Sequence, residues 1–158
     1  MEKIFIVLLI LTFLLGTTGG EISLPNLDPA DVDIEENKVT GNENIQESKS
    51  GSDDLIKVYK EEISGNASIN LSSDKGDIYL LFQEKITGNV KINITSTRGN
   101  IHLKFEDSIL GNPKINLQAP NGKVIFYNNV NTVGNANISI TANNVEYTSG
   151  KPKAMKDI

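Results

Sequence analysis

Short runs in which hydrophobic and polar residues alternate recur through the C-terminal two-thirds of the chain. In the first run, Ala67, Ile69 and Leu71 alternate with Ser68 and Asn70. The corresponding hydrophobic positions of later runs are Val90, Ile92 and Ile94, then Pro113, Ile115 and Leu117, then Ala136, Ile138 and Ile140. Because successive side chains of a strand point to opposite faces, each run predicts a β-strand with one buried and one polar face.

A second alternating run follows each of the first ones after a short turn. Its hydrophobic positions are Ile78, Leu80 and Phe82, then Ile101, Leu103 and Phe105, then Val124 and Phe126, then Val145 and Tyr147. The opposite face of these runs is also partly apolar, at Tyr79, Leu81, Ile125 and Tyr127. Strands that are covered on both faces lose the strict alternation, so we expect these second strands to be covered on both sides.

The two runs and their turns form a repeat of 23 residues. Its copies begin at Ile63, Ile86, Ile109 and Thr132, and each has a Gly-Asn pair at the same point, at Gly65-Asn66, Gly88-Asn89, Gly111-Asn112 and Gly134-Asn135. Three copies also share a turn glycine, at Gly76, Gly99 and Gly122, where a positive φ or a close backbone approach is usually required. The fourth copy lacks one residue and this glycine.

Two all-β architectures satisfy this pattern. One is a single-stranded β-solenoid of four to five 23-residue coils, and the alternative is an antiparallel β-meander in which each copy is a hairpin. Like residues lie about 4.8 Å apart in a solenoid and about twice as far apart in a meander. The asparagines recur at fixed positions, which favours the solenoid because stacked amides can bond from coil to coil. We expect a structural ladder of Asn66, Asn89, Asn112 and Asn135.

The two ends of the chain differ from the repeats. Residues 1–20 have a short charged start, an apolar stretch from Ile4 to Leu15 and small residues before Glu21, which predicts a cleaved signal peptide, with an uncleaved anchor as the rival interpretation. Residues 39–62 are interpreted as a degenerate capping repeat before the four-copy domain of residues 63–149. Residues 150–158 form a basic polar tail. Atypical terminal coils predict a monomer.

Charge divides the chain into an acidic arm and a repeat domain. Residues 21–54 carry ten acidic residues and two lysines, whereas residues 55–158 carry nine acidic and twelve basic residues. The arm itself, residues 21–38, has few apolar residues and two prolines, which predicts a flexible spacer. The whole chain is acidic and contains no cysteine, so we expect neither a nucleic-acid partner nor disulfides. With the leader, these features predict a secreted or cell-envelope protein.

Few residues offer reactive chemistry. His102 is the single histidine of the chain, and a lone histidine is typically structural or solvated because metal sites and proton shuttles need partners. Glu84 and Asp107 would lie in adjacent coils, and a polysaccharide-degrading enzyme would need such carboxylates about 5–10 Å apart in a cleft. Scattered surface charge is the favoured interpretation. We expect no catalysis, no metal and no cofactor.

The polar face of the first strands is the remaining candidate site. Its amides, hydroxyls and amines could hydrogen-bond a polysaccharide, and the candidate glycan-facing residues are Asn70, Lys91, Asn93, Thr95, Lys114 and Asn116. The other interpretation is a merely soluble outer face. Four sequons for N-glycosylation begin at Asn66, Asn70, Asn93 and Asn137. In a host that uses them, the attached sugars would obstruct this face.

At the level of the coils, and of GNVKINITSTRGNIHLKF in particular, the chain resembles an adhesin-like domain of unknown function. That family consists of exported β-solenoid repeats whose short apolar strands alternate with Ser/Thr-Gly-Asn or Ser-Gly-Asp turns. The resemblance covers about residues 63–147 and implies a structural or adhesion-like interaction role at the cell surface or envelope. Its partner would be an envelope component, a polysaccharide or a surface protein, and the family offers no catalytic residues to transfer. Membrane contact is expected only through an uncleaved leader.

Overall fold

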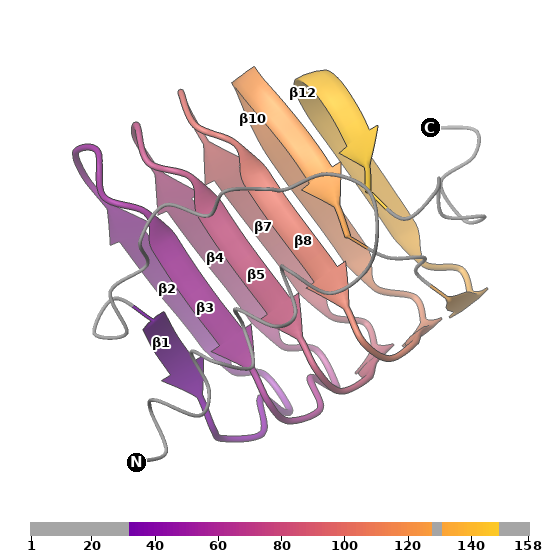
Figure 1. The fold of residues 1–158 in the computed structure, drawn as a ribbon. Coiled ribbons are helices and arrows are strands. Elements are labelled where there is room, and N and C mark those ends of the chain that lie inside the picture. Colours follow the sequence, from indigo (N-terminus) through magenta and orange to yellow (C-terminus); the bar gives the residue numbers. More distant parts are fainter. Residues whose placement is uncertain (1–31, 128–130, 149–158) are drawn as a thin grey trace.

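The computed structural model describes residues 32–127 and 131–148, which fold as an all-β solenoid of about five turns (Figure 1). The strands of the described ranges are β1 (Val32–Glu35), β2 (Asn44–Lys49), β3 (Leu55–Tyr59), β4 (Ser68–Ser73), β5 (Ile78–Phe82), β6 (Ile86–Gly88), β7 (Lys91–Ser96), β8 (Ile101–Phe105), β9 (Ile109–Gly111), β10 (Lys114–Phe126), β11 (Thr132–Gly134) and β12 (Asn137–Tyr147). No helix in these ranges is long and apolar enough to cross a membrane.

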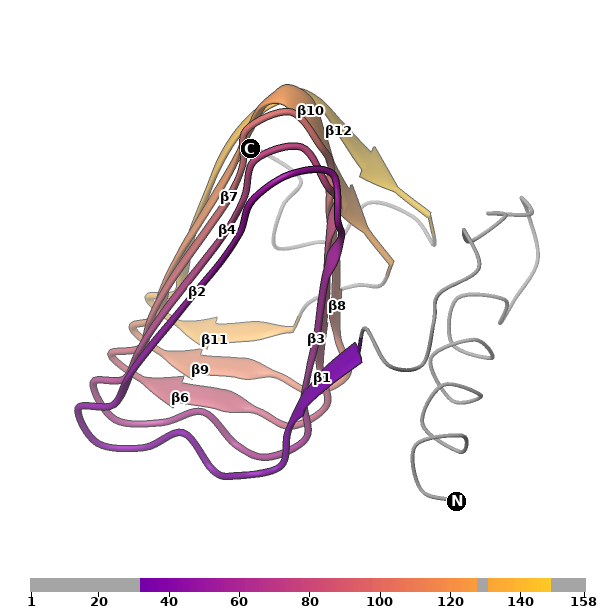
Figure 2. The same cartoon turned by 90° about the vertical axis from the view of Figure 1, so that its left-hand side faces the viewer.

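Each coil has three sides, which are visible when the stack is viewed along its length (Figure 2). The first side contains β2, β4, β7 and the beginning of β10 and β12. The second side contains β1, β3, β5, β8 and the end of β10 and β12. The short strands β6, β9 and β11 form the third side. Below, the first two sides are called the first sheet and the second sheet.

Neighbouring coils are paired in parallel and almost residue for residue. Ile69 pairs with Ile92, Ile92 with Ile115, and Ile115 with Ile138 in the first sheet. In the second sheet, Ile78 pairs with Ile101, which pairs with Val124. Equivalent residues of adjacent copies are therefore direct neighbours. The predicted solenoid is confirmed, and the antiparallel meander is wrong.

Strand β10 spans two sides of its coil because it continues through the corner between them. Its partner β12 follows it with a register shift between Ala119 and Lys123. Ala142 pairs with Ala119, 23 residues before it, but Asn144 pairs with Lys123, 21 residues before it. The fourth copy is therefore two residues shorter at this turn, because it lacks the glycine and one further turn residue.

Stacked hydrophobic side chains fill the interior of the coils. Ile69, Ile92 and Ile115 are buried at one position of the first sheet, and Ile78, Ile101 and Val124 at one position of the second. The rings of Tyr59, Phe82 and Phe105 stack along the axis with centroids 5.1 and 4.9 Å apart. Like side chains thus meet like side chains in every layer, so the repeat itself supplies the packing that a cysteine-free chain needs.

The two sets of glycines have different functions. Gly65, Gly88, Gly111 and Gly134 have positive φ values between 79° and 101°, which side chains other than glycine rarely adopt. The mid-copy glycines are needed instead for close approach between coils. A Cβ atom on Gly122 would overlap the carbonyl oxygen of Gly99, and one on Gly99 would overlap that of Gly76.

The N-terminal end of the stack is closed by a strand and a group of charges. Val32–Glu35, which belonged to the predicted flexible arm, forms β1 and pairs in parallel with β3. Lys57 lies at an inward position beside Leu80 and is buried, and its Nζ atom lies 2.8 Å from both Asp33 and Glu47. Glu47 occupies a position that is Leu71 in the next coil. Together these three side chains place a layer of paired charges over the end of the apolar core.

The C-terminal end lacks such a polar layer in the part of the chain that the structure describes. β12 is the last strand of the stack, and its Ile140, Ala142, Val145 and Tyr147 are only partly buried against the core. Phe126 and Tyr147 stack with ring centroids 5.5 Å apart. The predicted signal peptide, residues 21–31 of the arm and the whole basic tail lie outside the described residues.

Candidate interaction faces

The outer face of the first sheet carries all six residues predicted to face a glycan. Asn70, Asn93 and Asn116 are register partners in β4, β7 and β10, and Lys91 pairs with Lys114. Thr95 lies between Ser72 and Gln118 at a third position. These side chains point outward because their neighbours in the sequence, such as Ile92 and Ile94, are fully buried. The alternating pattern therefore places three parallel rows of polar groups on one flat side.

Two open hollows lie along this face. One is bordered by Gln46, Ser48, Asn70, Ser72, Asn93 and Thr95. The other is bordered by Lys91, Asn93, Lys114, Asn116, Asn137 and Ser139. Asn93 borders both hollows. Their lining residues come from β2, β4, β7, β10 and β12.

Hydrogen bonds fix the asparagines of this face. Asn70 donates from Nδ2 to Asn44 at 3.1 Å, and Asn93 donates to Asn70 at 2.8 Å. An amide has two N–H donors and two acceptor positions. Asn70 also donates to Ser68 at 3.2 Å and so uses both of its donors, whereas the ladder bond to Asn70 uses one donor of Asn93. The face can therefore offer ordered hydrogen-bonding groups whose orientation is already set.

A second ladder follows the turn that contains the Gly-Asn pairs. The side chain of Asn66 donates to Asn42, Asn89 to Asn66, Asn112 to Asn89 and Asn135 to Asn112, all at 3.2–3.3 Å. The backbone N–H groups of the last three donate to Gly65, Gly88 and Gly111 in the preceding coil. This ladder includes Asn42, one coil earlier than the predicted set. Its amides hold the coils in register.

The four predicted sequons lie on the ladders or beside them. Asn66 and Asn93 are exposed but use their amides in the ladders, whereas Asn70 is half-buried and bonded to Asn44 and Ser68. Asn137 is exposed at the start of β12. Attachment of a sugar to Asn66, Asn70 or Asn93 would use a side-chain nitrogen that donates a ladder bond. Modification at these three residues therefore competes with the stack itself.

The outer face of the second sheet is chemically different. It presents Ile56 and Val58 from β3, Tyr79 and Leu81 from β5, His102 from β8, and Ile125 next to Tyr127 from the end of the third coil. Ile56, Val58, Leu81 and Ile125 are 4%, 2%, 6% and 8% exposed although they point away from the core. This set is called the apolar face below. The expectation that the second strands are covered on both sides agrees with this burial.

His102 lies at the centre of the apolar face and has polar partners. Its Nδ1 atom lies 2.8 Å from the hydroxyl of Tyr127, and its Nε2 atom lies 3.2 Å from Asp77. Its ring stacks on Tyr79 with centroids 4.2 Å apart. Sequence reasoning treated His102 as a structural or solvated residue and did not find these partners. The 23-residue spacing of Tyr79 and His102 was the available signal.

The pKa values of Asp77 and Tyr127, which both contact His102, are shifted by their surroundings. Burial acts to raise the pKa of Asp77, but hydrogen bonds from His102 and Asn100 outweigh it and lower the pKa to about 2. Burial raises the pKa of Tyr127 to about 12, and the nearby Glu146 and Asp77 act in the same direction. Asp77 is therefore a carboxylate and Tyr127 a neutral phenol at neutral pH. This network fixes the ring of His102 between two coils.

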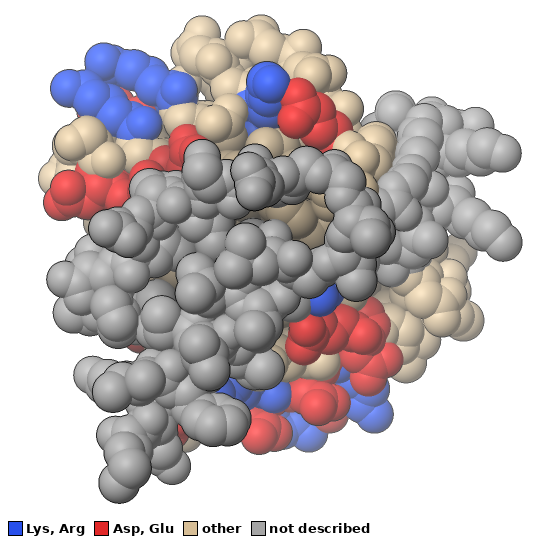
Figure 3. All heavy atoms as spheres, in the orientation of Figure 1, with Lys and Arg blue, Asp and Glu red and all other residues tan. Residues whose placement is uncertain are grey.

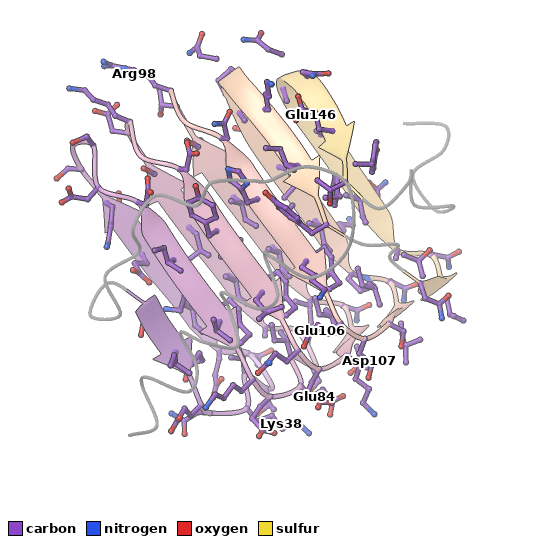
Figure 4. The ribbon with its side chains drawn as sticks, in the orientation of Figure 1. Lys38, Glu84, Arg98, Glu106, Asp107 and Glu146 are labelled. Atoms are coloured by element: carbon purple, nitrogen blue, oxygen red, sulfur yellow. The ribbon has the colours of Figure 1, made fainter. Side chains whose placement is uncertain are left out.

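The carboxylates considered for an enzyme lie at the margin of the coils. Figure 4 shows Glu84, Glu106 and Asp107 together at one end of the strands, opposite Arg98. Glu84 and Asp107 are exposed, and Asp107 accepts hydrogen bonds from the backbone and hydroxyl of Ser108. Neither carboxylate borders the hollows described above or the one on the apolar face. Their arrangement is that of solvated charges at a turn.

Several other charged side chains are paired between coils. Lys38 pairs with Glu62 at 2.8 Å, Lys123 with Glu146 at 2.6 Å, and Arg98 approaches Asp74 at 3.7 Å. In Figure 3 the visible charges of the described residues gather toward the two ends of the strands. Exposed pairs of this kind contribute at most about 1 kcal/mol each. These ion pairs lie toward the ends of the strands. The polar rows and the apolar face occupy the broad sides of the coils.

Comparisons with known proteins found no match. No family model, no curated protein and no solved structure matches this chain. Within residues 32–127 and 131–148, no group of three or more His, Cys, Asp or Glu side chains is placed to hold a metal ion. What the protein does must therefore be argued from its two faces.

Proposed function

We propose that this protein is an exported, envelope-associated β-solenoid with a structural or adhesion-like interaction role and no catalytic activity. The observation that carries this proposal is the regular first-sheet face, where Asn70, Asn93 and Asn116 repeat in register across three coils. A stack of coils at about 4.8 Å spacing presents the same group again and again. Such an array suits binding to a repetitive partner, because each additional contact adds to the affinity of the others.

The placement of titratable groups supports binding over catalysis. Asp77 and His102 are bonded to each other and to structural partners between coils, and Glu84 and Asp107 lie on exposed turns. A general acid and base must converge on one substrate position. The charged leader and apolar stretch of residues 1–20 support export. The partner would be an envelope component, a polysaccharide or a surface protein.

Cell fractionation tests the proposed location. The full chain with a C-terminal tag is produced in its host and compared with a Leu8→Arg/Leu9→Arg variant, whose apolar stretch is interrupted. We expect the unmodified chain in the envelope or the medium and the variant inside the cell. Equal retention of both proteins inside the cell would contradict export.

A second candidate function is carbohydrate binding by the first-sheet face. The two hollows bordered by Asn93 favour it, because amide and hydroxyl groups from several coils line them. Lys91 and Lys114 would add cationic groups at one margin, which suits an acidic or hydroxyl-rich polysaccharide. In this function Asn70, Asn93, Asn116 and Thr95 would bond sugar hydroxyls.

Retention on the host's insoluble envelope tests this second function. The full chain is compared with an Asn93→Asp/Asn116→Asp variant and with a control, Asn37→Asp/Asn131→Asp, which makes the same changes at exposed positions away from this face. We expect the first variant to lose at least about tenfold in retention, equivalent to about 1.4 kcal/mol, and the control to bind normally. Unchanged retention of the Asn93→Asp/Asn116→Asp protein would remove the glycan-binding proposal.

A further inference from the structure

Two lysines stand side by side on the first-sheet face. Lys91 and Lys114 are register partners in β7 and β10, and both are exposed. Register partners on neighbouring strands lie about 4.8 Å apart, so the two side chains leave the sheet from adjacent positions. Like charges at such positions repel each other and destabilise a sheet. The pair therefore costs the free protein some stability, and an anion bound between the two ammonium groups would offset that cost.

No carboxylate balances this pair in the part of the chain that the structure describes. The outward positions of the first sheet hold Asn, Gln, Ser, Thr and Lys there, but neither Asp nor Glu. On the other sides of the coils, Lys38, Lys60 and Lys123 each pair with a glutamate. The first-sheet face is therefore positive, although the whole chain has a net charge of -5. Charge complementarity favours an anionic partner for this face.

Hydrogen-bonding groups border the same hollow as the two lysines. The asparagine ladder of this face reaches Asn93, but the amide of Asn116 has no hydrogen-bond partner among the described residues. Asn137, the register partner of Lys114, also borders the hollow. A lysine ammonium only donates hydrogen bonds, whereas an asparagine amide both donates and accepts them. The hollow thus offers cations for an acidic group next to amides for hydroxyl groups, and an acidic sugar carries both kinds of group.

The composition of the face favours a polysaccharide over a nucleic acid. Its outward positions in the described strands include no arginine and no aromatic residue. Surfaces that bind nucleic acids use arginine and lysine for the phosphates and aromatic rings for the bases. Rows of amides and hydroxyls that repeat from coil to coil suit the repeated hydroxyl groups of a sugar chain instead.

We propose that the hollow at Lys91 and Lys114 binds an acidic polysaccharide. The ammonium groups bind its anionic groups, and the amides of Asn93, Asn116 and Asn137 bind its hydroxyl groups. This inference rests on the second candidate function, carbohydrate binding by the first-sheet face, and names the substrate class of that face. Binding then relieves the repulsion between the two lysines.

Binding to immobilised polymers tests this substrate class. The full chain is tested with polygalacturonate, alginate and hyaluronate as acidic polysaccharides, with dextran as an uncharged one, and with polyphosphate, which has charge but no sugar. We expect at least one acidic polysaccharide to bind at least about tenfold more tightly than dextran and polyphosphate. Raising the ionic strength from about 0.1 M to 1 M shortens the Debye length from about 10 Å to 3 Å, so this binding should weaken at least about tenfold.

Substitution of the two lysines tests their role. Lys91→Gln/Lys114→Gln should lose at least about tenfold in affinity for the acidic polysaccharide, whereas Lys91→Arg/Lys114→Arg keeps both charges and should still bind it. Lys75→Gln/Lys85→Gln removes the same charge at exposed positions off the first-sheet face and should bind normally. The Lys91→Gln/Lys114→Gln protein should unfold at a urea concentration no lower than that of the wild type, because a like-charge repulsion is removed.

Several results would overturn this inference. It fails if none of the three acidic polysaccharides binds, if dextran or polyphosphate binds as tightly as they do, or if Lys91→Gln/Lys114→Gln binds as well as the wild type. Carbohydrate binding by the first-sheet face survives such a result as long as Asn93→Asp/Asn116→Asp still reduces retention on the envelope. If the envelope does not retain the unmodified chain either, both proposals fail.

Discussion

The corner between the first and second sheets depends on single residues that recur once per coil. Asp54 accepts a hydrogen bond from the backbone N–H of Asp77 at 2.7 Å, Asp77 accepts one from Asn100 at 2.7 Å, and Asn100 one from Lys123 at 2.9 Å. Each side-chain oxygen thus binds the backbone of the next coil. The adjacent glycines allow the coils to approach closely enough for these bonds to form.

The Gly122→Ala substitution tests the close approach. Its Cβ atom would overlap the backbone of Gly99, so the two coils would have to move apart. We expect the free energy of unfolding to fall by about 3 kcal/mol in urea denaturation. Gly51→Ala is the matched control, because a Cβ there meets no atom within 4 Å and only the φ of 88° is strained. Gly51→Ala should lower the free energy of unfolding by about 1 kcal/mol. Equal losses of stability in Gly51→Ala and Gly122→Ala would contradict the close approach of the coils at Gly122.

The Asp77→Asn substitution tests the charge at the corner. Because the folded-state pKa of Asp77 lies at about 2, below its ordinary value of 3.8, its contribution to stability is present above pH 3.8 and is lost as the pH falls toward 2. Asn100 already occupies the equivalent position in the next coil, so an amide in place of the Asp77 carboxylate can keep the backbone bond. We expect the free energy of unfolding of the wild type to exceed that of the Asp77→Asn variant by about 1–2 kcal/mol at pH 6.

This difference should shrink as the pH is lowered, which urea unfolding between pH 6 and pH 2 can measure for both proteins. A difference that stays constant over this range would mean that the carboxylate of Asp77 contributes nothing through its charge.

At the scale of elements, the strands could be predicted because each carries a period of two and the copies agree. The alternation of Ala67, Ile69 and Leu71 fixes which side of β4 is buried, and the recurrence of asparagine predicts parallel stacking. The position of Lys57 could not be predicted in this way. It lies at an inward position and binds Asp33 and Glu47, and neither carboxylate is near it in sequence. Only the closure of the first coil brings these three residues together.

The outer partners of His102 escaped prediction for a related reason. Asp77 and Tyr127 lie 25 residues before and after it, whereas the repeat period aligns His102 with Tyr79 and Ile125. Its hydrogen bonds therefore run diagonally between strands. A period predicts direct neighbours, but it does not show which diagonal side chains are long enough to meet.

The turn ladder of asparagines offers a test at the scale of elements. Asn89 lies in the middle of it and is bonded to both Asn66 and Asn112. We expect Asn89→Ala to lower the free energy of unfolding by about 2 kcal/mol, because two side-chain hydrogen bonds are lost. Asn42→Ala, at the first position, loses one bond to Asn66 and should cost about 1 kcal/mol. A larger loss at Asn42 than at Asn89 would contradict the ladder.

At the scale of the whole molecule, the fold class and its period were predictable, whereas the ends were predictable only in part. The composition of residues 21–38 predicted a free arm, but Val32–Glu35 pairs with β3, because an open strand edge gains hydrogen bonds that composition does not report. The candidate glycan-facing residues were placed on one face by alternation alone. The apolar face of the second sheet was indicated by Tyr79 and Leu81.

All of these interpretations depend on parallel stacking of one coil every 23 residues, and cysteine pairs test this directly. Asn93 and Asn116 are register partners in the solenoid, at a separation that a disulfide can bridge. An antiparallel hairpin would instead place Asn93 beside Lys104, which lies on a different side of the coil. The account predicts that Asn93→Cys/Asn116→Cys oxidises within the monomer and that Asn93→Cys/Lys104→Cys does not. The opposite result would contradict it.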